Sequence, residues 1–294
     1  MRLSIITPSY RSSEWLRLCI ASVADQKEVE VEHIVQDSCS DDGTQDWLPQ
    51  DGRVKAFIEK DEGMYDAVNR GFRRASGEIL AYLNCDEQYL PGALEAVHNF
   101  FVEHPQAEAV LSDTVVADKE GNYICHRYAV TSSQYQLWVR FPVLTCSFFV
   151  RRRVVQEQGI YFDTQWRALG DFFWVMEMLK RGMRMKVLPR RTSVFTETGD
   201  NLCLTPRATW ERQRKWEMAP RLARLMNYPF IALFRARVAA RGSLFQKPFD
   251  YALYTLDSPN QRVTRHAARP TSFWPGRPIV LVPDRISQSA PHPP

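Results

Sequence analysis

Apolar strands and amphipathic helices alternate through residues 1–90. The runs "LSIITPSY", "VEHIVQDS", "VKAFIEK" and "EILAYLNCDE" predict four strands, because apolar and β-branched residues bounded by turn residues are typical of strands. Between them, "SSEWLRLCIASVADQ", "SDDGTQDWL" and "MYDAVNRGFRRAS" predict helices, the first capped by Ser12 or Ser13. This alternation predicts βαβ units, and hence an α/β fold with a mostly parallel sheet flanked by helices.

The second part of the chain has a more mixed pattern. "AEAVLSDTVVAD" and "GNYICHRYAV" predict two strands separated by the turn "KEGN", and "CSFFVRRRVV" predicts a strand that leads into a helix. "LGDFFWVMEMLKRG" predicts a helix that ends at Gly182, and "MRMKVLP" predicts a further strand. We therefore expect one domain over residues 1–205.

The composition changes after this domain. Residues 207–247 hold ten Lys and Arg but two acids, mixed with apolar side chains. We predict a basic, partly helical region over 206–250, either an amphipathic segment that meets anionic lipid, a helix packed on the domain, or a dimer interface. Residues 251–294 are rich in Pro and Ser, which predicts an extended tail.

Composition and charge narrow the class of protein. The net charge of +4 does not indicate a nucleic-acid partner. The six cysteines are scattered without metal-ligand spacing, which favours reduced thiols. The apolar N-terminal run is short for a signal peptide, and no segment approaches a transmembrane length. We therefore expect a cytoplasmic location.

Polar residues gather where the first four predicted strands end, and ligands of parallel sheets bind at these carboxyl ends. The strand ends carry these side chains: Thr7, Pro8, Ser9, Tyr10; Asp37; Lys60, Asp61; Asn84, Cys85, Asp86. Carboxylates placed there suit Mg²⁺ or Mn²⁺ bound with substrate phosphates. A polar loop that only caps a helix explains the segment around Asp86 equally well.

Other candidate residues also have two interpretations. Asp37 in "DSCSDDGT" is either a turn-forming acid or an acceptor for a ring N–H of a nucleotide base. Asp171 is either a helix cap or a general base that deprotonates a hydroxyl. Asp66, Asn69 and nearby arginines of "DEGMYDAVNRGF" form either a binding surface or a solvated helix face.

Four segments together resemble the GT-A-fold family 2 glycosyltransferases, in the family's order. They are "SIITPSYRSSEWLRLCIASVADQ", "DSCSDDGT", "DEGMYDAVNRGFRRASGEILAYLNCDE" and "GDFFWVMEMLKRG". The resemblance covers about residues 2–189 and is strongest for bacterial members that build surface polysaccharides. It implies a Rossmann-like GT-A sheet whose half at about 1–105 binds a nucleotide-sugar, while the half at about 106–205 binds the acceptor.

The resemblance also implies roles for individual residues. Asp37 would read the base, which favours UDP and leaves GDP and dTDP open. The remaining nucleotide-sugar contacts that it implies are Thr7, Pro8, Ser9, Tyr10, Lys60, Asp61, Gly63, Tyr65, Asp66, Asn69, Gly71, Asn84 and Cys85. The family's Asp-x-Asp metal motif reads Asn84-Cys85-Asp86 here, so Asp86 would ligate Mn²⁺ or Mg²⁺ without the first Asp. Asp171 would be the base, although Gly170 replaces the acid that often precedes it.

The implied reaction is transfer of a sugar, with inversion, from a nucleotide-diphospho-sugar to an acceptor. The acceptor would be a saccharide or lipid-linked saccharide, reached from the inner face of the cell membrane through residues 207–247. "ERQRKW" is also faintly similar to the Q-x-x-R-W element of processive members. The alternatives are a nucleotidyltransferase, for which no glycine-rich loop is found near the N-terminus, and an inactive sugar-nucleotide-binding protein.

Overall fold

The protein is described by a computed structural model that covers residues 1–199 and 201–275. Its centre is a nine-stranded sheet with the order β3-β2-β1-β4-β8-β6-β9-β5, and β7 pairs with β6. The strands are β1 (Leu3–Ser9), β2 (Val31–Asp37), β3 (Lys55–Ile58), β4 (Ile79–Tyr82), β5 (Gln88–Tyr89), β6 (Ala109–Asp118), β7 (Tyr123–Arg127), β8 (Phe148–Arg151) and β9 (Met185–Glu197). The predicted α/β class is confirmed.

The first four strands run parallel, as the alternating pattern predicts. β1 lies between β2 and β4, and all seven of its residues are buried. A strand covered on both faces reads as a continuous apolar run, which explains "LSIITPS". β8 then runs antiparallel to both β4 and β6, whereas β9 is parallel to β6. The carboxyl ends of β1 and β4 therefore meet at one edge of the sheet.

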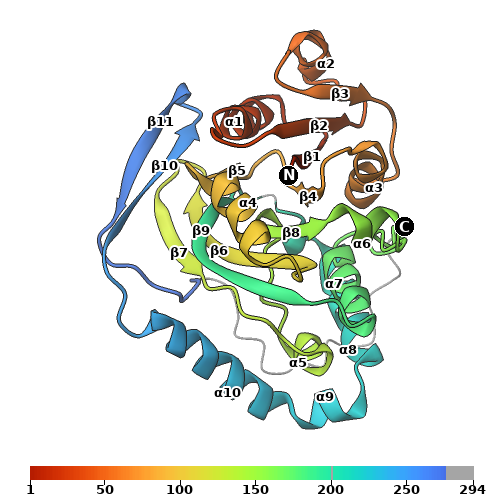
Figure 1. Cartoon of the computed structure of the whole chain (residues 1–294), viewed down its shortest axis with the longest axis vertical. Helices are drawn as coiled ribbons and strands as arrows, with labels where there is room; N and C mark the ends of the chain where they lie inside the picture. Colours follow the sequence, from red (N-terminus) through yellow and green to blue (C-terminus); the bar gives the residue numbers. More distant parts are fainter. Residues whose placement is uncertain (200, 276–294) are drawn as a thin grey trace.

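Helices cover both faces of the sheet and continue past its far edge (Figure 1). They are α1 (Ser13–Ala24), α2 (Thr44–Trp47), α3 (Met64–Arg74), α4 (Ala93–Glu103), α5 (Gln134–Val139), α6 (Arg152–Gln156), α7 (Gly170–Lys180), α8 (Pro206–Met218), α9 (Arg221–Leu225) and α10 (Asn227–Val238). The basic segment that follows the sheet supplies α8, α9 and α10. In Figure 1, α9 and α10 run along the lower edge of the molecule beside α5.

The predicted extended tail over 251–294 is wrong for residues 251–267. β10 (Phe249–Thr255) and β11 (Ser258–Ala267) form an antiparallel hairpin that lies against α1. Burial alternates along β10 with the period of a strand, and this side packs on Leu90 and Val115. Arg262 pairs at 2.5 Å with Asp25, which directly follows α1. Residues 276–294, which the same prediction includes, lie outside the described residues.

Candidate active site

A cavity of about 990 Å³ opens at the carboxyl ends of β1 and β4. Its walls come from the loops after β1, β3 and β4, from the start of α7 and from the segment after β9. The structure brings eleven of the predicted site residues together on these walls: Pro8, Ser9, Tyr10, Lys60, Asp61, Gly63, Tyr65, Asn84, Cys85, Asp86 and Asp171. Residues that lie more than half of the chain apart in sequence thus line the same cavity.

Asp37 does not lie on the wall of this cavity. Its side chain is fully buried at the end of β2. One carboxylate oxygen accepts the backbone N–H of Ser40 at 2.8 Å, and the other accepts the Ser40 hydroxyl at 2.7 Å. This fixes the turn that presents Ser38, which does line the cavity. The turn-forming interpretation of Asp37 therefore holds, and its contact with a base stays a prediction.

Three further predicted residues also do not line the cavity. The hydroxyl of Thr7 is 2.8 Å from His33 Nε2. The amide group of Asn69 exchanges two hydrogen bonds of 2.9 Å with the backbone of Phe162. Asp66 pairs with Arg70 at 2.8 Å, one turn along α3. These contacts hold the loops around the cavity, so direct nucleotide contacts from these residues remain predictions.

The turn after β2 also anchors the loop after β1. Arg11, which lines the cavity, forms two hydrogen bonds of 2.6 and 2.7 Å with the carboxylate of Asp41. Asp42 accepts the N–H of Ser13 at 2.8 Å and the Thr44 hydroxyl at 2.6 Å. Asp42, rather than the predicted Ser12 or Ser13 side chain, therefore caps the start of α1.

Asp86 and Asn84 provide the oxygen atoms that a divalent cation would need. Asp86 Oδ2 accepts a hydrogen bond of 3.4 Å from Asn201, and the buried Oδ1 of Asn84 has no hydrogen-bond partner in the described part of the chain. Within that same part, no cluster of three His, Cys, Asp or Glu side chains is placed to hold a metal. Magnesium often uses one or two carboxylates together with substrate phosphates and water. The donor set therefore fits a cation whose coordination a bound diphosphate completes.

Burial disfavours the ionised form of two acids in the loop after β4, Asp86 and Glu87. Burial raises the pKa of both Asp86 and its neighbour Glu87, and the negative charge of Asp86 raises the pKa of Glu87 further. Glu87 accepts the N–H of Asn84 at 2.9 Å and thereby shapes the loop. A positive charge beside Asp86 would favour its ionised form.

Asp171 reaches the cavity from the first turn of α7 and is half-buried. Burial raises the pKa of its carboxyl to about 7, although the N–H of Phe172 at 2.7 Å and the nearby ammonium of Lys215 oppose that rise. A carboxylate with a pKa near neutrality is suited to accept a proton. A side chain at position 170 would meet the ring of Tyr65 at 2.6 Å, which explains why glycine replaces an acid there.

Lys215 and Glu211 of α8 support this part of the site, and the sequence did not reveal them. Burial lowers the pKa of the Lys215 ammonium to about 8, while Asp171 opposes that fall. Glu211 is fully buried and accepts the backbone N–H groups of residues 167, 168 and 169 at 2.8 to 2.9 Å. Both belong to "ERQRKW". The one sequence feature that could have pointed to Glu211 is that it is an acid in a segment otherwise rich in arginine.

Arg127, Arg140 and Trp274 also line the cavity without having been predicted. Arg127 ends β7, which the sequence predicted as a strand, whereas Arg140 follows α5, a helix that the sequence analysis did not predict. Trp274 follows the β10–β11 hairpin, and its indole N–H donates to Glu197 at 3.1 Å. The approach of Trp274 to the cavity depends on the three-dimensional path of the C-terminal segment, for which the sequence holds no local signal.

Comparisons with known proteins show what the chain as a whole is similar to. The family model described as "Glycosyl transferase family 2" matches residues 4–177. The chain is 35% identical over 207 residues to TuaG of Bacillus subtilis (strain 168), assigned as a teichuronic acid biosynthesis glycosyltransferase; the match covers 69% of this chain and 77% of TuaG.

Two solved structures share the fold. The S. aureus TarS 1-349 complex with UDP has a TM-score of 0.58 and 19% identity, covering 84% of this chain and 76% of that one. Another structure of the same TarS chain is matched over 60% of its length. The mannosyltransferase from Pyrobaculum calidifontis, solved with GDP-Man and Mn²⁺, has a TM-score of 0.51 and 18% identity, covering 82% of this chain and 76% of that one.

Proposed function

The chain belongs to glycosyl transferase family 2 and has the GT-A fold, and from this premise we propose that it transfers a sugar from a nucleotide-diphospho-sugar to an acceptor hydroxyl with inversion. One observation carries the proposal. Asp86 and Asp171, which come from different elements, line the same cavity of about 990 Å³. Asp86 is suited to hold a cation at the leaving group, and Asp171 is suited to accept the proton of the attacking hydroxyl. The family assignment argues against the nucleotidyltransferase alternative.

The donor nucleotide is proposed to bind against the loop of Pro8, Ser9 and Tyr10, with Lys60 and Asp61 on the neighbouring wall. These residues follow the carboxyl ends of parallel strands, where such folds bind ligands. UDP is the proposed nucleotide. TarS was solved with UDP, whereas the Pyrobaculum mannosyltransferase was solved with GDP-Man.

The leaving group is a nucleoside diphosphate, which gains negative charge as its bond to the sugar breaks. Asp86 and the Asn84 amide oxygen would hold Mn²⁺ or Mg²⁺ there together with the diphosphate. When bound, the cation would stabilise this charge without a proton transfer. Asp86 and Asn84 thus orient the diphosphate, and the surrounding walls exclude water that would otherwise hydrolyse the donor.

The acceptor is proposed to be a saccharide or a lipid-linked saccharide. Its hydroxyl oxygen attacks C1 of the sugar while the bond from C1 to the diphosphate oxygen breaks, and the hydroxyl proton passes to the Asp171 carboxylate. A single displacement inverts the configuration at C1. Positioned general bases of this kind contribute about 10²- to 10⁴-fold to the rate.

The proposal is tested by incubating the protein with a panel of UDP-, GDP- and dTDP-sugars in the presence of Mn²⁺ and saccharide acceptors. We expect release of the nucleoside diphosphate from one donor and, by NMR, a product whose anomeric configuration is opposite to that of the donor. Retained configuration would contradict the single displacement. A nucleotide-sugar that binds without any turnover would instead favour the inactive binding protein, which the Asn84 substitution in the metal motif keeps open.

A further inference from the structure

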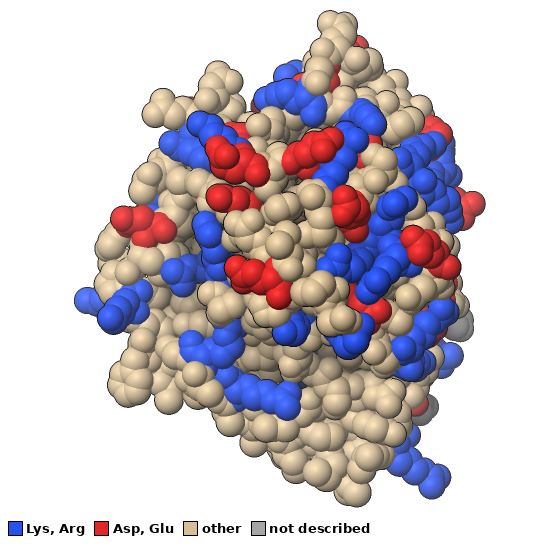
Figure 2. Space-filling view, viewed as in Figure 1, with Lys and Arg blue, Asp and Glu red and all other residues tan. Residues whose placement is uncertain are grey.

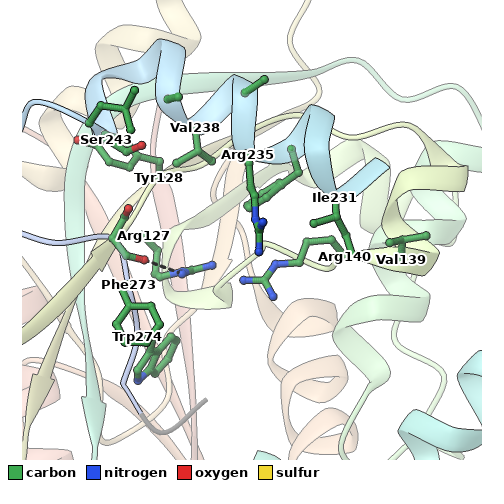
Figure 3. Close-up of a pocket in the computed structure, with 15 residues that line it drawn as sticks. Arg127, Tyr128, Val139, Arg140, Ile231, Arg235, Val238, Ser243, Phe273 and Trp274 are labelled. Carbon is green, nitrogen blue, oxygen red and sulfur yellow. Dashed lines mark hydrogen bonds between the residues drawn. The ribbon is translucent and has the colours of Figure 1, made fainter. Parts of the chain in front are cut away.

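A second cavity of about 540 Å³ lies directly beside the donor cavity. It is enclosed by α10, by the segment from β7 to α5 and by residues 272–274 (Figure 3). Arg127, Arg140 and Trp274 line both cavities. A molecule in the second cavity would therefore reach the space in which sugar transfer is proposed.

Three guanidinium groups converge in this second cavity. Figure 3 shows Arg235 of α10 pointing toward Arg140, and Arg127 pointing toward the same space from the end of β7. Within the described part of the chain, none of the three forms an ion pair with a carboxylate. The nearby carboxylate of Asp113 is already occupied, because Arg241 binds it at 2.8 and 3.0 Å.

Neutral groups offset this positive charge only in part, because the guanidinium of Arg140 lies 5.4 Å from the ring centroid of Phe234 and that of Arg127 lies 5.9 Å from that of Trp274. The buried Nε of Arg140 has no hydrogen-bond partner among the described residues, and Arg127 donates one hydrogen bond of 3.1 Å to the carbonyl of Ser272. Burial lowers the pKa of Arg140 to about 10, and the charges of Arg127 and Arg235 lower it further. Arg127 and Arg140 are partly buried, whereas Arg235 is exposed. A partly buried cation without an anionic partner is costly, and arginines pair with phosphate oxygens in a bidentate geometry.

The remainder of the wall is apolar. Its side chains are Val139, Ile231, Phe234, Val238, Leu244 and Phe273. Inorganic phosphate would leave this surface in contact with water. A nucleotide would place a polar ribose and base against it. An amphiphile that carries a phosphate has groups for both parts of the cavity.

We propose that this cavity binds the phosphate or diphosphate of a lipid-linked acceptor, whose first hydrocarbon units lie along α10. The inference rests on the proposed glycosyl transfer and specifies its acceptor. Because Arg127 and Arg140 stand between the two cavities, the phosphate lies at the junction and the acceptor hydroxyl extends toward Asp171. Arg235 lines only the second cavity, so it serves the acceptor and not the donor.

Isothermal titration calorimetry on the full chain tests this site with farnesyl phosphate, farnesol and inorganic phosphate, each below its aggregation concentration. We expect farnesyl phosphate to bind most tightly, because it alone fills both parts of the cavity. Arg235→Gln and, separately, Arg140→Gln should weaken its binding about tenfold, the effect of losing one charge-assisted hydrogen bond. The exposed Arg224→Gln on α9 is the matched control and should bind as the wild type does.

Two further measurements make the result decisive. UDP binding to Arg235→Gln should equal that of the wild type, whereas a loss of UDP binding would assign the arginines to the donor and overturn the proposal. Equal binding of farnesol and farnesyl phosphate, or equal loss in Arg224→Gln, would overturn it as well. Turnover of nucleotide-sugars is measured separately with saccharide acceptors. A failure of this site therefore leaves the proposed function standing, whereas a failure of turnover with farnesyl phosphate still bound would count against the proposed function.

Discussion

At the scale of single residues, the site depends on two ionisable groups whose pKa values burial moves toward each other. The pKa of Asp171 rises to about 7 and that of Lys215 falls to about 8. Each group is less charged than it would be in water, yet each stabilises the charge of the other. Asp171 can therefore take up a proton near neutral pH, and Lys215 adjusts how readily it does so.

The activity is expected to follow the ionisation of Asp171. A general base works when it is deprotonated, so kcat/KM should rise as the pH passes upward through about 7. The profile is measured from nucleoside diphosphate release at saturating metal. Glu177→Gln, on an exposed part of the same helix, should leave the profile unchanged.

The Lys215→Met variant tests in which direction the midpoint of this pH profile moves. The ammonium of Lys215 lowers the pKa of Asp171, so its removal should raise that pKa and move the midpoint of the profile to higher pH. A midpoint that stays in place, or that moves to lower pH, would show that another group controls the profile.

Asp86 is expected to control the dependence on metal. EDTA should abolish turnover and added Mn²⁺ should restore it, while Asp86→Asn should lower turnover by about 10²- to 10³-fold at saturating Mn²⁺, because less charge stabilisation reaches the leaving group. Asp46→Asn, an exposed acid of α2, serves as the control. Full turnover of the wild type in EDTA would remove Asp86 from this role.

At the scale of elements, α8 fixes the loop that delivers Asp171 to the cavity. Glu211 accepts three consecutive backbone N–H groups of residues 167–169 and pairs with Arg207 at 3.0 Å. The helix therefore acts as a brace for the start of α7. For α8, the structure thus agrees with the predicted alternative of a helix packed on the domain, and it places this helix next to the candidate site.

Loss of this brace should be measurable as stability. Glu211→Ala leaves buried N–H groups without an acceptor, and we expect the free energy of unfolding in urea to fall by about 3 to 5 kcal/mol. Glu217→Ala, on the exposed side of the same helix, should change it little. Glu211→Gln retains one acceptor oxygen and should lie between them. Equal unfolding curves for Glu211→Ala and the wild type would contradict the brace.

The elements that the sequence predicted carry a local signal; β10 carries one as well and was nevertheless missed. β1 is a continuous apolar run because the whole strand is buried. In α1, the apolar residues recur with the helical period because they form its buried side. The partners of Glu211 lie 42 to 44 residues earlier in the chain, so no local pattern could indicate them. β11 was missed because Ser and Pro residues concealed a strand that is mostly exposed.

At the scale of the whole molecule, α9 and α10 form a band of exposed apolar side chains and arginines. Leu225 is 80% exposed, Tyr228 62% and Phe245, just after α10, 89%. In Figure 2, the lower part of this face, where α9 and α10 lie, is mostly uncharged, with a few Lys and Arg and little Asp or Glu. None of the helices in the described residues has the length and hydrophobicity to cross a bilayer. The band suits the proposed contact with a membrane surface.

Binding to vesicles tests this contact. We expect the protein to sediment with vesicles that contain phosphatidylglycerol more than with pure phosphatidylcholine, and less so at high salt. The double variant Leu225→Asp and Phe245→Asp should reduce the binding, whereas Val102→Asp, on exposed α4, should not. If the double variant instead converts a dimer to a monomer, the band is a subunit interface.

The central claim is that one cavity holds a nucleotide-sugar in front of Asp171, and a single comparison tests it most directly. The affinity for the donor and the rate of sugar transfer are measured together for the wild type and for Asp171→Asn. The account predicts unchanged donor affinity and a rate lower by about 10²- to 10⁴-fold. Undiminished transfer by Asp171→Asn would contradict it.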